Sequence, residues 1–225
     1  MTVPVRRTLI ILLLVVALVF GLTVSRQLNE RESATAALLP APELSQYNTY
    51  VYDQGRELAE FTLYNEQGDE VTRDALKGRW TFAFIGYTYC PDICPATMAM
   101  LRQTSRRIPV DLPQPDFLLI SADPERDTPE HLQEYLAFFG DSFHGLTGDK
   151  NTLRALASSL NGVFIERTGP NGEALVDHSA HITLIDPNGE MIAILQPPHD
   201  PDGMVAAYRA IYEWAKKNHP RASRG

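Results

Sequence analysis

The segment Thr81-Phe-Ala-Phe-Ile-Gly-Tyr-Thr-Tyr-Cys90-Pro-Asp-Ile-Cys94-Pro95 joins a short apolar run to two closely spaced cysteines. Residues 82–86 are apolar, which indicates a buried strand that ends in a loop. Proline favours the first helical turn and restricts the residue before it, so we expect a helix from about residue 95 to 107. The cysteines would then lie in the loop that caps this helix, where the positive end of the helix dipole favours thiolate over thiol.

These two cysteines are the only ones in the chain, so a disulfide within one chain must join Cys90 to Cys94. Closing so small a ring would constrain the unfolded chain weakly, by at most ~3 kcal/mol. A reduced pair can instead bind a thiophilic metal or take part in thiol–disulfide exchange. We favour metal binding over redox chemistry, and both of these over a purely structural disulfide.

The N-terminus indicates a membrane anchor. Arg6 and Arg7 precede an uncharged, apolar stretch over residues 8–25, which as a helix would span ~27 Å, close to the ~30 Å hydrocarbon core of a bilayer. We expect residues 1–25 to form a cytoplasmic stub and a single uncleaved transmembrane helix, with the rest of the chain outside. A cleaved signal peptide is the alternative. Residues 26–45 favour a flexible tether, followed by one domain over residues 46–225.

The charge of the chain limits its partners. The formal net charge is −8, and Arg6 and Arg7 both precede the apolar stretch. The chain beyond residue 25 therefore holds all 28 acidic residues but only 18 of the 20 basic ones. This acidity argues against nucleic acid and against anionic membrane surfaces as partners.

Apolar runs alternate with amphipathic segments through the domain, which predicts an α/β fold with helices on both faces of a sheet. In such sheets, sites lie at the carboxyl ends of the strands, where the two cysteines fall. The expected strands cover residues 58–64, 80–86, 117–121, 163–166, 181–185 and 190–195. The expected helices start near residues 95, 128, 151 and 204, and residues 186–189 form a hairpin turn.

A metal would need a ligand besides the two thiolates. Spacing alone does not choose among the six histidines. His178 and His181 flank the start of an apolar strand, and positions three apart on a strand face opposite sides, so only one of them should reach a given metal. The adjacent Asp177 is placed to orient an imidazole. The histidines are His131, His144, His178, His181, His199 and His219.

Four ordered motifs resemble the Sco/SenC family over nearly the whole domain, from about residue 50 to 217. The motifs are Gly86-Tyr-Thr-Tyr-Cys-Pro-Asp-Ile-Cys-Pro95, Ser121-Ala-Asp-Pro-Glu-Arg-Asp-Thr-Pro129, Gly145-Leu-Thr-Gly148 and Val176-Asp-His-Ser179.

The resemblance implies a thioredoxin-like, peroxiredoxin-related fold behind a transmembrane helix. It also implies a copper-binding metallochaperone that helps to assemble the binuclear copper site of cytochrome c oxidase. Carried over residue by residue, the copper ligands are Cys90, Cys94 and His178. The implied partners are the copper-site subunit of the oxidase and a thioredoxin-like reductant. The implied location is the bacterial plasma membrane, with the domain on the periplasmic side.

The chemistry of the donor set agrees with copper, since thiolates select Cu(I), whereas zinc prefers a fourth ligand that the sequence does not offer. The alternative is a thiol–disulfide oxidoreductase in which Cys90 and Cys94 reduce the oxidase's cysteines or sense redox state, so enzymatic activity stays open. A peroxidase is disfavoured, because Thr88 lacks the spacing of a peroxiredoxin Thr-x-x-Cys motif. We interpret residues 123–127 as a loop and helix cap at the rim of the site rather than as acid–base catalysts.

Overall fold

The computed structural model describes residues 13, 16–25, 39–91, 93–169, 172 and 174–218. The chain divides into two compact units, Met1–Leu39 and Pro40–Gly225. In the first unit, residues 16–25 are helical. Within the described part of the chain, no helix is both long and apolar enough to cross a bilayer. Much of the predicted anchor and most of the predicted tether lie outside the described residues, so both stay predictions.

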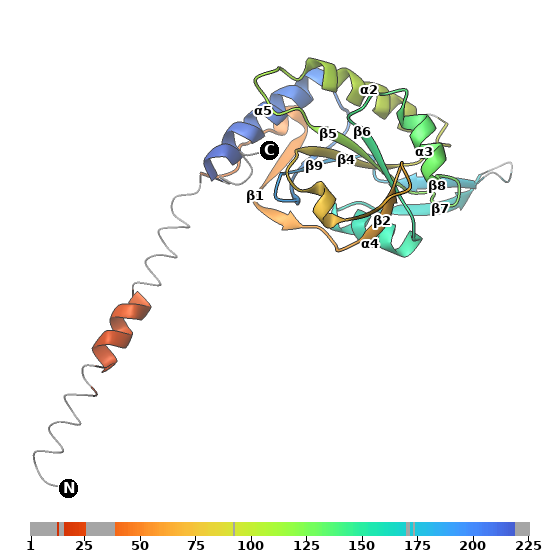
Figure 1. The fold of residues 1–225 in the computed structure, drawn as a ribbon. Helices are drawn as coiled ribbons and strands as arrows, with labels where there is room; N and C mark the ends of the chain where they lie inside the picture. The colour runs from red at the N-terminus through yellow and green to blue at the C-terminus, as the bar shows by residue number, and fades with distance from the viewer. Residues whose placement is uncertain are drawn as a thin grey trace, which may run out of the picture. The chain divides into compact units, whose positions relative to one another are not determined.

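The second unit is built on a mixed eight-stranded sheet of order β1-β10-β9-β4-β5-β6-β2-β3 (Figure 1). Strands β4, β5 and β6 are parallel, and the remaining neighbours are antiparallel. The strands are β1 (Thr49–Glu57), β2 (Thr62–Asn65), β3 (Glu70–Thr72), β4 (Thr81–Gly86), β5 (Asp116–Ser121), β6 (Phe143–Thr147), β7 (Phe164–Thr168), β8 (Ala174–His178), β9 (Ile182–Ile185) and β10 (Glu190–Leu195). The helices are η1 (Ser45–Tyr47), η2 (Arg73–Leu76), α2 (Ile93–Arg107), α3 (Pro129–Leu136), α4 (Lys150–Ser159) and α5 (Pro201–Asn218).

Helices cover both faces of this sheet, as the alternating sequence pattern predicts. Alternate residues of β4 point to opposite faces, so Phe82 and Phe84 pack under α2, α3 and α5, whereas Ala83 and Ile85 pack against α4. All six residues of β4 are buried. This strand is therefore a rigid support for the cysteine loop that follows it.

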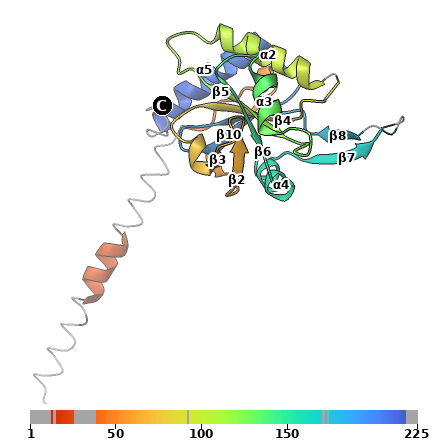
Figure 2. The same ribbon diagram turned by 45° about the vertical axis from the view of Figure 1, so that its right-hand side comes forward.

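Strands β7 and β8 form a separate two-stranded sheet. In Figures 1 and 2 this hairpin extends away from one side of the main sheet. At the base of the hairpin its two arms are joined, because the Ser179 N–H donates to the Val163 carbonyl at 2.9 Å and the Val163 N–H donates to Ser179 Oγ at 3.0 Å. His178 is the last residue of β8.

Several predicted elements differ from the observed ones. The predicted strand over residues 58–64 shortens to β2, and β1, β3, β6 and β8 were not predicted. Helix α2 begins at Ile93 rather than at Pro95, so Cys94 lies in its first turn and not in the preceding loop. The proline at position 95 still falls within the first turn, where its missing N–H costs no hydrogen bond.

Candidate metal centre

The two cysteines lie at the carboxyl end of β4, as expected for a site in an α/β sheet. Both are thiols rather than a disulfide, and both are buried, with 9% of Cys90 and 1% of Cys94 exposed. Cys90 lies in the loop between β4 and α2, and the Cys94 N–H points to Cys90 Sγ at 3.5 Å. The two sulfurs thus lie close together at the start of α2.

The hairpin brings His178 to this thiol pair. Its Nε2 lies 3.4 Å from Cys94 Sγ, and its Nδ1 lies 3.1 Å from the Ser179 carbonyl oxygen. With a proton on Nδ1 donated to that carbonyl, the Nε2 lone pair faces the sulfur. The ligand atoms of Cys90, Cys94 and His178 all lie within 4.8 Å of one another, and they form the only such His/Cys/Asp/Glu group among the described residues.

These distances suit a three-coordinate metal. Bonds of about 2.0–2.3 Å in a trigonal centre would hold the ligand atoms about 3.5–4 Å apart. The observed group therefore needs only small side-chain movements to close on an ion. Two sulfurs and one imidazole nitrogen form a soft donor set, which favours a thiophilic metal over magnesium or calcium.

Burial controls the protonation of the site. It raises the pKa of Cys94 to about 12, more than the Tyr87 backbone hydrogen bond lowers it. Burial also lowers the pKa of His178, against the opposing effect of the Ser179 carbonyl. Burial thus favours the thiol form of Cys94 and the neutral form of the His178 imidazole. At Cys94 the loss of solvation therefore opposes the preference for thiolate that we expect from the helix dipole.

The other histidines are held elsewhere. His181 directs Nε2 to the Leu160 carbonyl at 3.0 Å, so only His178 reaches the thiols. The reason differs from the predicted alternation along one strand, because β8 ends at His178 and β9 begins only at Ile182. The rings of His199 and His144 form hydrogen bonds with the Ala180 carbonyl and the Glu66 carboxylate, respectively. The ring of His131 stacks on that of Tyr89. His219 lies outside the described residues.

Asp177 does not orient the imidazole as expected. Its carboxylate forms an ion pair with Arg167 at 2.7 Å, and both side chains are more than half exposed. The carbonyl of Ser179 takes the predicted role instead. Asp177 and His178 are consecutive in a strand, so their side chains point to opposite faces, which explains the difference.

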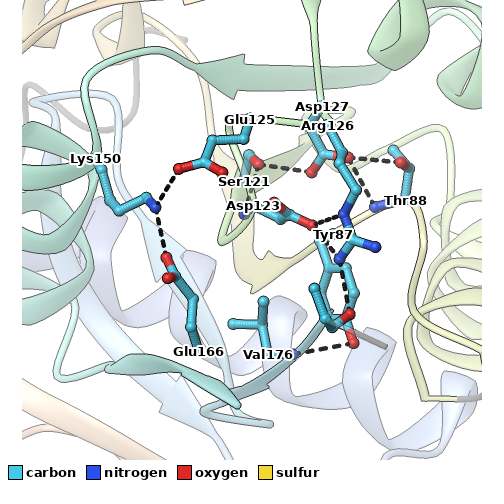
Figure 3. Close-up of polar contacts among 11 residues, drawn as sticks. Tyr87, Thr88, Ser121, Asp123, Glu125, Arg126, Asp127, Lys150, Glu166 and Val176 are labelled. Atoms are coloured by element: carbon cyan, nitrogen blue, oxygen red, sulfur yellow. Dashed lines mark hydrogen bonds and ion pairs between the residues drawn. The ribbon is translucent and has the colours of Figure 1, made fainter. Parts of the chain in front are cut away.

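A buried carboxylate anchors the cysteine loop, and the sequence did not indicate this role. Asp127, with 0% of its surface exposed, accepts hydrogen bonds from Thr88 N–H (3.2 Å), Thr88 Oγ1 (2.5 Å) and Ser121 Oγ (2.6 Å), as Figure 3 shows. The helix cap is the next residue, Thr128, whose side chain accepts from the His131 N–H. The loop that follows β5 therefore supports the cysteine loop through Asp127.

The site opens to solvent on one side. Cys90 and His178 line a depression together with Tyr87, Pro91 and Ile93, whereas Cys94 lies beneath it. Ile93 is 57% exposed beside this opening. A metal held by the three side chains would therefore be reachable by a partner's side chain.

Comparison with known proteins places the fold and motifs in one group. A family model described as SCO1/SenC matches residues 51–213. A protein of Stutzerimonas stutzeri whose name describes it as copper-binding is 34% identical over 162 residues, which cover 72% of this chain and 79% of that protein. The mitochondrial SCO1 homolog 1 of Arabidopsis thaliana is 34% identical over 149 residues, 64% of this chain but 44% of the relative.

Two solved structures are similar over most of the second unit. Copper-bound ScoI of Arabidopsis thaliana aligns with a TM-score of 0.65 at 30% identity, covering 69% of this chain and 98% of that one. Copper-bound ScoI of Bradyrhizobium japonicum aligns with a TM-score of 0.61 at 30% identity, covering 69% of this chain and 99% of that one.

Proposed function

Because this chain belongs to the SCO1/SenC family, we propose that it is a copper-binding metallochaperone that helps to assemble the binuclear copper site of cytochrome c oxidase. Cys90, Cys94 and His178 are the proposed ligands. The observation that carries the proposal is the convergence of two sulfurs and one imidazole nitrogen within 4.8 Å of one another. The copper-bound structures of the similar ScoI proteins support copper as the metal.

The donor set favours Cu(I) over zinc. Thiolate and imidazole ligands suit Cu(I), which accepts three ligands, whereas structural zinc sites have four. The described residues add no fourth His, Cys, Asp or Glu to the group. Binding must displace the proton that burial favours on Cys94, while the lowered pKa of His178 favours the neutral imidazole that a metal ligand requires.

The test is an anaerobic Cu(I) titration of the reduced full-length chain against a chromophoric competitor. Cys90→Ser and Cys94→Ser should each abolish tight binding, because one thiolate and one imidazole make a poor Cu(I) site. His178→Ala should weaken binding at least ~10-fold. His181→Ala is the matched control and should leave affinity and spectrum unchanged, since its ring contacts Leu160. Stoichiometric, undiminished binding by Cys94→Ser would refute the ligand assignment.

A thiol–disulfide oxidoreductase is the second candidate, and the pair of neighbouring thiols at the start of a helix favours it. In this role Cys90 and Cys94 would reduce the cysteines of the oxidase copper site. The two candidates separate at the histidine, because His178→Ala should impair a chaperone but leave thiol–disulfide exchange intact. Either role requires reduced thiols, so we also propose a thioredoxin-like reductant as a partner.

We further propose that residues 1–25 anchor the chain in the bacterial plasma membrane, that residues 26–45 are a tether, and that residues 46–225 lie on the outer side. The two arginines before the apolar stretch support this orientation. Protease added to intact spheroplasts should degrade the domain and leave a membrane-bound N-terminal fragment. A mature protein that begins near residue 37 would contradict the anchor.

A further inference from the structure

The three proposed ligands come from two parts of the fold with separate support. Cys90 and Cys94 follow β4, which is buried between two layers of helices. His178 ends β8, which pairs with β7 in a sheet of its own. No ladder of backbone hydrogen bonds joins β8 directly to β4, so side chains that contact both parts can influence the distance between the imidazole and the thiols.

Arg126 contacts both of these parts. On the cysteine side its guanidinium carbon lies 5.0 Å from the centre of the Tyr89 ring and 5.9 Å from that of Tyr87. On the hairpin side its Nη2 donates to the Ala174 carbonyl oxygen at 3.1 Å. An ion pair with Asp123 orients the side chain. A planar guanidinium can stack on a ring and donate in several directions at once, which a lysine cannot do.

Tyr87 continues this connection to the imidazole. Its ring packs edge-to-face on His178 at 6.1 Å between centroids, and its hydroxyl accepts a hydrogen bond from the Val176 N–H at 3.4 Å. Figure 3 shows Arg126 and Tyr87 together beside Val176. The preceding residue of the same loop, Glu125, forms an ion pair with Lys150, and Lys150 also pairs with Glu166 of β7. Arg126 thus contacts β8 directly, and Glu125 is linked to β7 through Lys150.

We propose that Arg126 is a positioning residue that holds the β7–β8 hairpin against the cysteine loop and so sets His178 within bonding reach of the metal that the thiols bind. This inference rests on the proposed copper function and assigns to Arg126 a role that acts through His178. Arg126 is not one of the three proposed ligands, which are Cys90, Cys94 and His178.

The experiment compares Arg126→Gln with Arg154→Gln. Arg154 is a matched control because it also lies against the hairpin, over the Phe164 ring at 5.6 Å, but has no contact with Tyr87 or Tyr89 among its described interactions. Amide hydrogen exchange of the full-length apoprotein reports the position of the hairpin without any metal. Exchange at Val176 and His178 should accelerate in Arg126→Gln and stay within about twofold of the parent in Arg154→Gln.

Cu(I) competition then gives a double-mutant cycle with His178→Ala. Arg126→Gln should weaken copper binding about 10-fold in the parent chain, the size of typical losses when a partner of a ligand is removed. It should cost nothing further once His178 is absent. Thermal unfolding of the apoproteins checks that both arginine variants are folded.

The outcomes separate the two proposals. Unchanged exchange in Arg126→Gln overturns the positioning role, whether or not the chain binds copper. Equal losses of copper affinity with and without His178 also overturn it, because Arg126 would then act on the thiols or on general stability. A parent chain that does not bind copper refutes the proposed function, while the exchange measurement still decides the role of Arg126.

Discussion

Replacement of Asp127 should destabilise the domain by an amount that its hydrogen bonds determine. The carboxylate is fully buried and accepts three hydrogen bonds, two from Thr88 and one from Ser121. Asp127→Ala leaves the buried Ser121 hydroxyl and the half-buried Thr88 donors without this acceptor, and a buried group left unpaired costs about 1–3 kcal/mol. Relaxation and water entry recover part of this sum, so we expect a loss of about 3–5 kcal/mol in the free energy of unfolding.

Asp127→Asn separates the effect of the hydrogen bonds from that of the charge. The amide oxygen can still accept from Thr88, and its NH₂ group can donate to Ser121 Oγ. Burial raises the pKa of Asp127 despite these hydrogen bonds, so the charged carboxylate is less favourable here than in water. A neutral amide avoids that penalty, and we therefore expect Asp127→Asn to lie within about 1 kcal/mol of the parent chain.

Urea unfolding of the reduced apoproteins, followed by circular dichroism, measures both values. Asp111→Ala is the matched control, because its carboxylate pairs with Arg209 on the surface, where solvent screens the ion pair, and its loss should change stability little. A loss below about 1 kcal/mol for Asp127→Ala would refute the reasoning. So would a loss for Asp127→Asn as large as that for Asp127→Ala.

Two further predictions test the packing behind the thiols and the opposite end of the sheet. In Gly86→Ala the new Cβ would lie 3.0 Å from Cys94 Sγ, so the thiol must shift. We expect the free energy of unfolding in urea to fall by about 1–3 kcal/mol and Cu(I) binding to weaken. No change in either quantity would contradict the close approach. The buried Glu66 carboxylate lies 3.0 Å from His144 Nδ1. Burial raises the pKa of Glu66, but hydrogen bonds from His144 and Gly145 outweigh it and lower this pKa from 4.5 to about 2. The same hydrogen bond to Glu66 raises the pKa of His144. The lowered pKa of Glu66 stabilises the fold above pH ~4.5, and this contribution is lost as the pH falls towards 2. The raised pKa of His144 stabilises the fold below pH ~6.5, and this contribution is lost as the pH rises through the pKa of the folded state. Urea midpoints between pH 3 and 9 should therefore be highest near pH 5–6 relative to Glu66→Gln, and a constant difference across this range would show that the pair is not coupled to folding.

The sequence predicts the centre of the sheet well, since β4, β5, β9 and β10 are runs of buried apolar residues. Strand β1 escapes prediction because only its first residues alternate between buried and exposed, while residues 53–57 are mostly exposed. Strand β8 has one buried residue, Val176, and pairs only with β7, so its sequence carries little of the apolar signal on which the prediction depends.

The metal site likewise has features that the sequence predicts and others that only the fold reveals. The spacing of the cysteines indicates soft-metal or redox chemistry by itself, but the choice of His178 came from the family motif and not from periodicity. The protonation of Cys94 and the contacts of Asp127 and Arg126 depend on burial and on residues far apart in the chain. Local sequence reasoning has no access to either.

The separation of the ligands along the chain has a consequence for the unfolded state. A disulfide between Cys90 and Cys94 would close a ring of a few residues and remove little of the entropy of the unfolded chain. An ion shared by Cys94 and His178 would join positions 84 residues apart. A permanent cross-link of that span would lower the entropy of the unfolded chain by the equivalent of about 4–5 kcal/mol. A chain that carries copper should thus resist thermal unfolding far more than the same chain with its cysteines oxidised.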